Sequence, residues 1–123
     1  MTCNELRIGN WVKYPHLIGN VLHEFDSISG IFENNSVSIK SRPYTAFTLD
    51  SVNSIPLTEE WLEKFGFTKG KFNYKWQFGN FIYDQKLKLW TWFGVQLHDY
   101  LIEFVHQLQN LYLALTGQEL TIK

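Results

Sequence analysis

The feature that most constrains the fold is a strict alternation of aromatic and polar residues just past the middle of the chain. The aromatic residues are Phe72, Tyr74, Trp76 and Phe78, and the polar residues between them are Lys71, Asn73, Lys75 and Gln77. Successive side chains of a β-strand point to opposite faces, so this spacing places every ring on one face. Gly79-Asn80 then supplies a turn before residues 81–83, which are apolar again. The segment therefore predicts a β-hairpin with one aromatic face.

Short apolar segments separated by turn residues make up the first half of the chain. The segments cover residues 11–14, 21–25, 31–32 and 37–40, and the breaks fall at Gly9-Asn10, Gly19-Asn20, Asp26-Ser27, Gly30 and residues 33–36. Strands this short and this closely spaced are typical of a small curled antiparallel sheet or an SH3-like barrel. We therefore expect an N-terminal sheet of this kind.

Two helices are predicted, one on each side of the aromatic hairpin. Thr58 is a good N-cap residue, Glu59 and Glu60 follow it in the first turn, and Gly66 can end a helix in a left-handed conformation. Residues 104–115 place apolar side chains at helical spacing before Gly117, and residues 120–122 are apolar enough for a last strand. The predicted fold class is α+β, with the N-terminal sheet, a short middle helix, a β-meander and a C-terminal helix.

Length, charge and cysteine content narrow the class of protein. At 123 residues the chain has the size of one domain, so we expect a single domain over residues 1–123. Its net charge of −1 provides no overall attraction to nucleic acid or to an acidic membrane. The single cysteine, Cys3, cannot form an internal disulfide, and no apolar run is long enough to cross a membrane. We therefore expect a cytoplasmic protein that does not bind membranes.

Motifs that carry chemistry are absent from the sequence. There is no Gly-x-Ser-x-Gly, no glycine-rich phosphate loop and no His-Glu-x-x-His. The four histidines, His16, His23, His98 and His106, lack the spacing of metal ligands. We expect a protein that is not an enzyme and that holds no metal or cofactor.

Lysine and tryptophan residues gather in the predicted meander. Residues 69–92 contain five lysines and one acidic residue, Asp84. If residues 86–93 form a strand whose leucine side faces the core, lysine and tryptophan side chains lie together at the surface. Rings can stack on bases while ammonium groups neutralise phosphates, so this surface suits a nucleotide or single-stranded nucleic acid. The candidate ligand-binding residues are Lys71, Lys75, Lys86, Lys88, Trp90 and Trp92.

A second interpretation of the same segment buries the tryptophans. Large apolar side chains are mostly inside proteins, and the C-terminal helix must pack on some surface. Trp90 and Trp92 would then lie beneath that helix, in a sheet covered on both faces. The lysines would form a solvated edge that discourages strand-to-strand aggregation. The sequence leaves both interpretations open.

The C-terminal helix offers another candidate surface. His106, Gln109, Asn110 and Leu113 lie opposite its apolar stripe. A leucine among amides suggests a protein interface, with another protein or a second copy of the chain as the partner. If the helix is instead covered on both sides, these residues are internal.

Three sequence blocks carry a family resemblance. They are residues 6–12 (LRIGNWV), residues 55–62 (IPLTEEWL) with 65–67 (FGF), and residues 105–112 (VHQLQNLY) with 114–117 (ALTG) and 119–120 (EL). Together they resemble a group of small uncharacterised proteins encoded by phages, prophages and mobile elements. The resemblance implies a phage-type accessory protein inside a bacterial host cell, acting by protein–protein interaction to modulate or evade the host. It implies no role for any individual residue.

Overall fold

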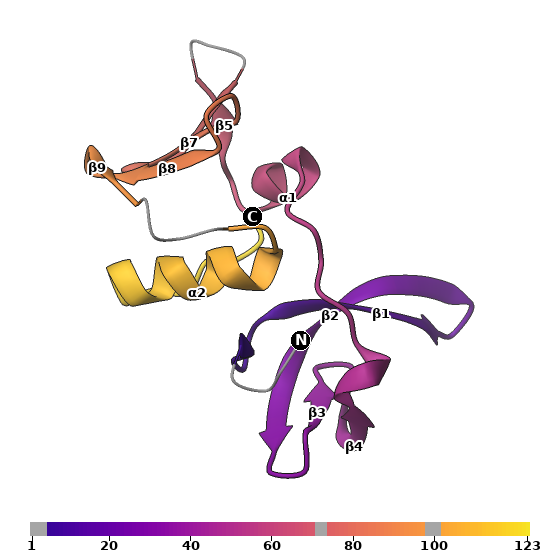
Figure 1. Cartoon of the computed structure of the whole chain (residues 1–123). Helices are drawn as coiled ribbons and strands as arrows, with labels where there is room; N and C mark the ends of the chain where they lie inside the picture. The colour runs from indigo at the N-terminus through magenta and orange to yellow at the C-terminus, as the bar shows by residue number, and fades with distance from the viewer. Residues whose placement is uncertain (1–4, 71–73, 98–101) are drawn as a thin grey trace. The chain divides into compact units, whose positions relative to one another are not determined.

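The computed structural model describes residues 5–70, 74–97 and 102–123, and these residues form two compact units. The first unit comprises residues 1–56 and 103–119, and the second comprises residues 57–102 and 120–123. Each unit contains one antiparallel sheet and one α-helix, which confirms the α+β class (Figure 1). The two units are described separately below, and a single domain over residues 1–123 stays a prediction.

The sheet of the first unit has four strands in sequential order. They are β1 (Trp11–Ile18), β2 (Val21–Phe32), β3 (Ser36–Ile39) and β4 (Arg42–Thr48), followed by a short 3₁₀ helix, η2 (Leu49–Ser51). Register shifts between β1 and β2, and again between β2 and β3, bend the long strand β2. The buried core of this sheet consists of Leu6, Val12, Ile28, Val37 and Val52. The expected curled N-terminal sheet is thus present.

This sheet differs from the sequence prediction in two details. Residues 21–32 form one continuous strand, although breaks were expected at Asp26-Ser27 and at Gly30. Gly30 serves close packing rather than a turn, because a Cβ there would lie 2.7 Å from Ser38 Oγ. Strand β4 was not predicted at all. It is an almost wholly exposed edge strand containing Pro43, a residue that ordinarily argues against a strand.

The C-terminal helix α2 (Val105–Thr116) belongs to the first unit and confirms the predicted helix. It begins at a short β-bridge between Pro56 and Phe104, beside which Val105 N donates a hydrogen bond to Ile55 O at 2.8 Å. It ends at Gly117, which has a left-handed φ of 74°. The bridge fixes where the helix starts, a point that the apolar pattern alone left ambiguous.

The second unit confirms the predicted short helix and β-meander (Figure 1). Its elements are α1 (Glu59–Lys64), β5 (Thr68–Lys69), β6 (Lys75–Phe78), β7 (Phe81–Asp84), β8 (Leu89–Trp92) and β9 (Val95–Gln96), with the strands in sequential order. Thr58 caps α1 by accepting a hydrogen bond from Trp61 N at 3.5 Å. After the left-handed Gly66, Phe67 N donates to Leu62 O at 2.9 Å and closes the helix end.

The aromatic hairpin has the predicted turn and a buried aromatic face. Strands β6 and β7 pair from Lys75 with Asp84 to Phe78 with Phe81, and the turn between them contains the left-handed Gly79. Trp76 and Phe81 are almost completely buried. Lys71, Phe72 and Asn73, at the start of the alternating run, lie outside the described residues.

Two predicted strands of the second unit require correction. Residues 85–88 form a turn, so the strand expected over residues 86–93 is only β8. Its buried side carries Trp90, which is 2% exposed, so the structure selects burial of Trp90 from the two interpretations that the sequence left open. Residues 120–122 form no strand, although Lys123 N donates to Lys64 O at 2.7 Å. Among the described residues, no helix is long and apolar enough to cross a membrane.

Candidate functional site

The lysines and tryptophans proposed as a ligand site are separated by the meander. Lys86 and Lys88 are exposed in the turn between β7 and β8, and Lys75 begins β6, so these three lysines share one end of the sheet. Trp92 is the last residue of β8 and lies at the opposite end. Lys71 lies outside the described residues. A base stacked on Trp92 would therefore lie at the far end of the strand from the lysines.

Trp90 is part of the core and offers no face to a ligand. Its ring stacks on Tyr83 with the centroids 4.5 Å apart and meets Phe67 edge to face at 6.1 Å. Burial raises the pKa of the Tyr83 hydroxyl, and the neighbouring Asp84 carboxylate raises it further. Trp90 is therefore buried, against Tyr83 and Phe67 of its own unit, whereas Trp92 is half-buried.

The amides of the predicted helix interface are bonded within the first unit. Gln109 accepts a hydrogen bond from Trp11 N at 2.8 Å and donates one to Gly9 O at 3.0 Å. Asn110 Oδ1 accepts from Arg7 Nε at 3.1 Å and from Asn10 Nδ2 at 2.9 Å, and Asn110 Nδ2 donates to Glu5 O at 3.0 Å. Both amides thus hold α2 against the N-terminal segment through several hydrogen bonds each.

The other two residues of that helix face are also covered to different degrees. His106 is 1% exposed, and Leu113 is half-buried. Burial lowers the pKa of His106, an effect that the nearby Glu5 carboxylate partly opposes. His106 and Gln109 are therefore internal, as expected if the helix is covered, and do not form an exposed interface.

The first and third of the blocks that carry the family resemblance meet in the first unit. Residues 6–12 and 105–112 are joined by the amide network of Gln109 and Asn110, and Glu119 forms an ion pair with Arg7. Of the middle block, only Ile55 and Pro56 belong to this unit, and Val105 N donates a hydrogen bond to Ile55 O. These contacts give the bonded residues of the blocks a structural role that requires no ligand.

A serine, a histidine and an aspartate converge beside β4 without the geometry of a nucleophilic relay. Ser41 Oγ donates to Asp26 Oδ2 at 2.5 Å and lies 3.2 Å from His16 Nε2. His16 Nδ1 faces the carbonyl oxygen of Tyr14 at 2.6 Å, rather than a carboxylate. In a relay the imidazole lies between serine and carboxylate and takes the serine proton, whereas here that proton is directed to Asp26. The cluster therefore fastens β1, β2 and the start of β4 together.

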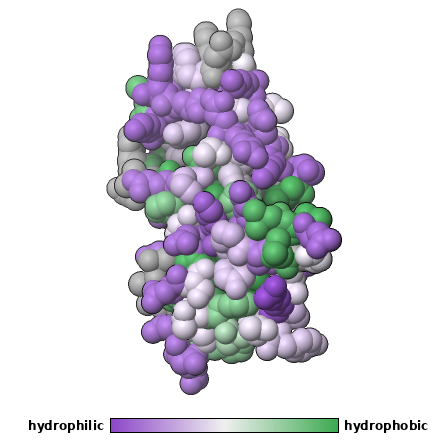
Figure 2. Space-filling view, turned by 90° about the vertical axis from the view of Figure 1, so that its right-hand side faces the viewer, coloured by the Kyte–Doolittle hydropathy of each residue, from purple (hydrophilic) through white to green (hydrophobic). Residues whose placement is uncertain are grey.

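The feature that sequence reasoning missed is the end of the β1–β2 hairpin, residues 17–22, which we call the hairpin end. Leu17, Val21 and Leu22 are 59%, 61% and 59% exposed there. The hairpin end lies at the right of Figure 1, and the same side of the molecule shows a hydrophobic patch in Figure 2. The signal in the sequence is that apolar residues flank Gly19-Asn20 without the polar alternation of a half-buried strand.

The hairpin end is exposed because, among the described residues, no third strand pairs with it. Strand β3 pairs only with residues 28–32 of β2, so β1 is the only strand paired with residues 21–27 among those described. Leu17 pairs with Leu22, and Ile18 pairs with Val21, around the turn at Gly19-Asn20. A two-stranded ribbon has no layer of its own to cover either face. The local pairing thus displays aliphatic side chains to solvent.

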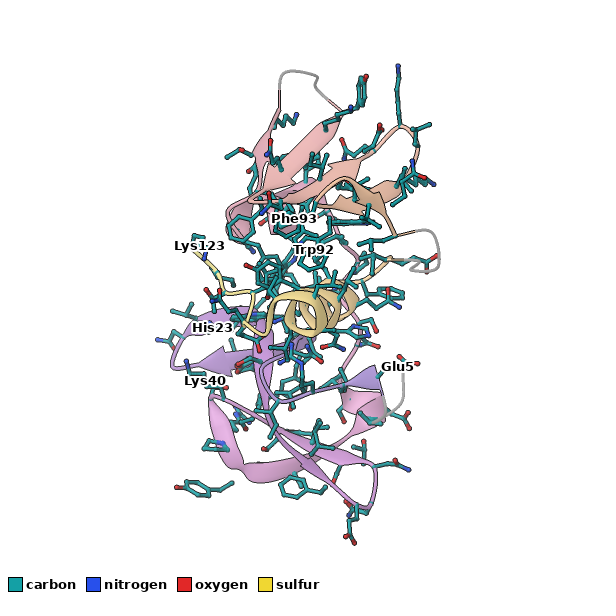
Figure 3. All side chains as sticks on the ribbon, turned by 90° about the vertical axis from the view of Figure 1, so that its left-hand side faces the viewer. Glu5, His23, Lys40, Trp92, Phe93 and Lys123 are labelled. Atoms are coloured by element: carbon teal, nitrogen blue, oxygen red, sulfur yellow. The ribbon has the colours of Figure 1, made fainter. Side chains whose placement is uncertain are left out.

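A second exposed apolar feature is the turn between β8 and β9, residues 92–95, which we call the aromatic tip. Phe93 and Val95 are 65% and 63% exposed. The Phe93 ring meets the Trp92 ring edge to face, with the centroids 4.9 Å apart (Figure 3). The aromatic tip contributes one bulky exposed ring, whereas the hairpin end contributes a group of aliphatic side chains on paired strands.

Comparison with known proteins adds no assignment. No family model matches the chain, and neither the curated proteins nor the solved structures give a match. The resemblance to small phage-encoded proteins therefore stays a prediction. In the described part of the chain, no group of three or more histidine, cysteine, aspartate or glutamate residues could hold a metal ion.

Proposed function

We propose that the protein acts by binding another protein through the hairpin end. The observation that carries this proposal is the exposure of Leu17, Val21 and Leu22, each close to 60%, on paired strands. Contiguous exposed aliphatic side chains on a soluble domain are typical of an interaction surface. None of the residues 17–22 is charged, which matches the depletion of charge at the centre of protein interfaces.

The expected gain from covering these side chains is large enough to matter for binding. Full burial of an aliphatic side chain contributes about 1.5–3 kcal/mol. Since each of the three is about 60% exposed, covering them would contribute roughly 3–5 kcal/mol in total. That energy corresponds to a factor of roughly 10² to 10⁴ in affinity. The hairpin end would therefore be the energetic centre of the interface rather than its rim.

The setting of the proposal comes from the family resemblance. A phage-type accessory protein acts in the cytoplasm of a bacterial host cell, so the proposed partner is a host protein whose activity is modulated or evaded. The protein would act by occupying a surface of that partner and would catalyse no reaction. Its binding would depend weakly on salt, because apolar burial rather than ion pairing would supply most of the energy.

The test is a charge substitution at the hairpin end with a matched control elsewhere. Leu22→Glu should lower the affinity for the partner at least 100-fold, because it places a carboxylate in an apolar contact. The partner is first recovered from bacterial cells with the wild-type chain, and binding of the purified pair is then measured by calorimetry.

Leu87→Glu is the control, because Leu87 is 71% exposed in the β7–β8 turn of the second unit. Both variants should keep the far-ultraviolet circular dichroism spectrum of the wild type, since both positions are exposed. The proposal fails if Leu22→Glu binds the partner as tightly as Leu87→Glu does.

A further inference from the structure

We infer that the start of helix α2 is sensitive to acid: uptake of a proton by the buried His106 ring detaches the first turn of the helix, residues 105–108, from the first unit. This inference concerns the first unit alone and stands independently of the proposed function. It assigns a regulatory role to a buried ionisable side chain.

The His106 ring is enclosed without hydrogen-bond partners for its nitrogens. The residue is 1% exposed, and neither ring nitrogen has a partner among the described residues. A charged group loses far more hydration on burial than a neutral one, so this environment tolerates an imidazole better than an imidazolium. Protonation of the ring is therefore costly while the helix start stays packed.

The charges nearest to the ring compensate only part of that cost. Helix α2 contains no aspartate, glutamate, lysine or arginine, and His106 is its second residue, where the positive end of the helix dipole opposes another positive charge. Glu5 Oε2 lies 3.9 Å from His106 Nε2, beyond hydrogen-bond distance, on a side chain that is 53% exposed. Burial accordingly lowers the pKa of His106, and the Glu5 carboxylate opposes this effect in part.

The other charged groups around α2 are paired or exposed. Arg7, which contacts α2 through Asn110, forms an ion pair with Glu119. Lys13 of β1, the strand packed against α2, is exposed, and so is Glu103 just before the helix. Glu5 is thus the carboxylate that the described residues place within reach of the ring.

Acid rather than base weakens this attachment. The ring has its ordinary pKa of 6.5 when it is in water, and a lower pKa when it is packed. Above pH 6.5 the ring is neutral in both states, and the packed form keeps its full stability. As the pH falls below 6.5, the detached ring takes up a proton before the packed ring does, so the packed form loses stability.

The first turn of α2 can release the ring without breaking the rest of the helix attachment. It is joined to the first unit by the hydrogen bond from Val105 N to Ile55 O at 2.8 Å, beside the bridge between Pro56 and Phe104. The next turn is held by the amide side chains of Gln109 and Asn110, which do not titrate. Protonation therefore acts on the first turn and leaves these amide hydrogen bonds in place.

The experiment measures hydrogen exchange of the Val105 amide by NMR in the full chain at pH 7.5 and 5.5, corrected for the intrinsic effect of pH on exchange. Uptake of one proton can raise the opening equilibrium constant at most about tenfold over this interval. We expect a rise of at least about threefold in the wild type and a nearly constant value in His106→Phe, whose ring binds no proton. The Phe67 amide, bonded to Leu62 O in the second unit, is the control and should change by the same factor in both proteins.

Glu5→Gln tests the electrostatic part of the inference. It removes the carboxylate beside His106 Nε2 and keeps the Glu5 carbonyl oxygen that accepts a hydrogen bond from Asn110. Because the imidazolium loses a nearby opposite charge, acid should raise the opening constant of Val105 more in this variant than in the wild type. The two substitutions therefore change the pH dependence in opposite directions.

Three results would overturn the inference: unchanged Val105 protection in the wild type, an equal rise in His106→Phe, or a folded-state pKa of His106 at or above 6.5. The last is measured by NMR titration of the ring protons in the wild type, so the inference stays testable if His106→Phe does not fold. A rise in Glu5→Gln no larger than in the wild type would overturn the role given to Glu5.

Discussion

At the scale of single residues, Phe93 holds a backbone conformation that bulky residues avoid. Its φ is 51° and that of Gly94 is 77°, which are the two central positions of the turn between β8 and β9. Two-residue hairpin turns with positive φ at both positions favour Asn-Gly. Phe93 is 65% exposed, so burial of its ring offsets little of the strain. Strain kept at an exposed aromatic residue is more typical of a functional position than of a structural one.

The corresponding prediction is that Phe93→Asn stabilises the protein by about 1 kcal/mol, because asparagine tolerates the left-handed conformation better. The measurement is urea denaturation followed by circular dichroism. Val95→Thr is the control, since Val95 is exposed in a strand and its replacement should change the free energy of unfolding by less than about 0.5 kcal/mol. A loss of stability in Phe93→Asn would show that the contact between the Phe93 and Trp92 rings outweighs the backbone strain.

At the scale of elements, helix α2 is held to the N-terminal segment by amide hydrogen bonds as well as by apolar burial. Asn110 alone makes three such bonds, with Arg7, Asn10 and the Glu5 carbonyl. Asn110→Ala should therefore lower the free energy of unfolding by about 1–3 kcal/mol, because two donors and one acceptor lose their partner.

Thermal denaturation of Asn110→Ala beside Gln118→Ala tests this prediction. Gln118 is an exposed amide just beyond the end of α2, so its replacement should leave the midpoint nearly unchanged. Equal midpoints for the two variants would mean that water replaces the Asn110 hydrogen bonds at no cost and that apolar burial alone holds the helix.

The elements that the sequence predicts well are those built from local signals. The cap at Thr58 and the left-handed Gly66 fix both ends of α1, and alternation with Gly79-Asn80 fixes the β6–β7 hairpin. The elements it predicts poorly depend on distant contacts. Strand β2 continues through Gly30 because Ser38 approaches there, and β4 exists only because β3 pairs with it.

The candidate site was not predicted, because exposure is not a local property of a sequence. An apolar run around Gly19-Asn20 is consistent with a buried hairpin as well as an exposed one. The outcome depends on how far β3 extends along β2, which only the folded sheet determines. The same reason explains why the sequence left the burial of Trp90 open. Alternation separates the two faces of β8 but does not indicate which of them meets Phe67 and Tyr83.

At the scale of the whole molecule, the chain passes between the two units more than once. Residues 57–102 interrupt the first unit, and residues 120–123 return to the second unit after α2. In the second unit Lys123 N donates to Lys64 O, and Lys123 Nζ lies 5.2 Å from the centre of the Phe78 ring. Leu120 is 1% exposed. The last four residues therefore supply both a buried side chain and a hydrogen bond next to the end of α1.

We predict that a chain ending at Glu119 loses about 2–4 kcal/mol of stability in the second unit, because removing a buried leucine leaves a cavity. Tryptophan fluorescence measures this loss selectively, since four of the five tryptophans, Trp61, Trp76, Trp90 and Trp92, belong to the second unit. Lys123→Ala is the matched control, because it removes the ammonium–ring contact and keeps Leu120 and the backbone hydrogen bond. An exposed cation–ring contact contributes only about 0.5–1 kcal/mol. If the truncated chain and Lys123→Ala unfold at the same urea concentration, Leu120 does not contribute to the stability of the second unit.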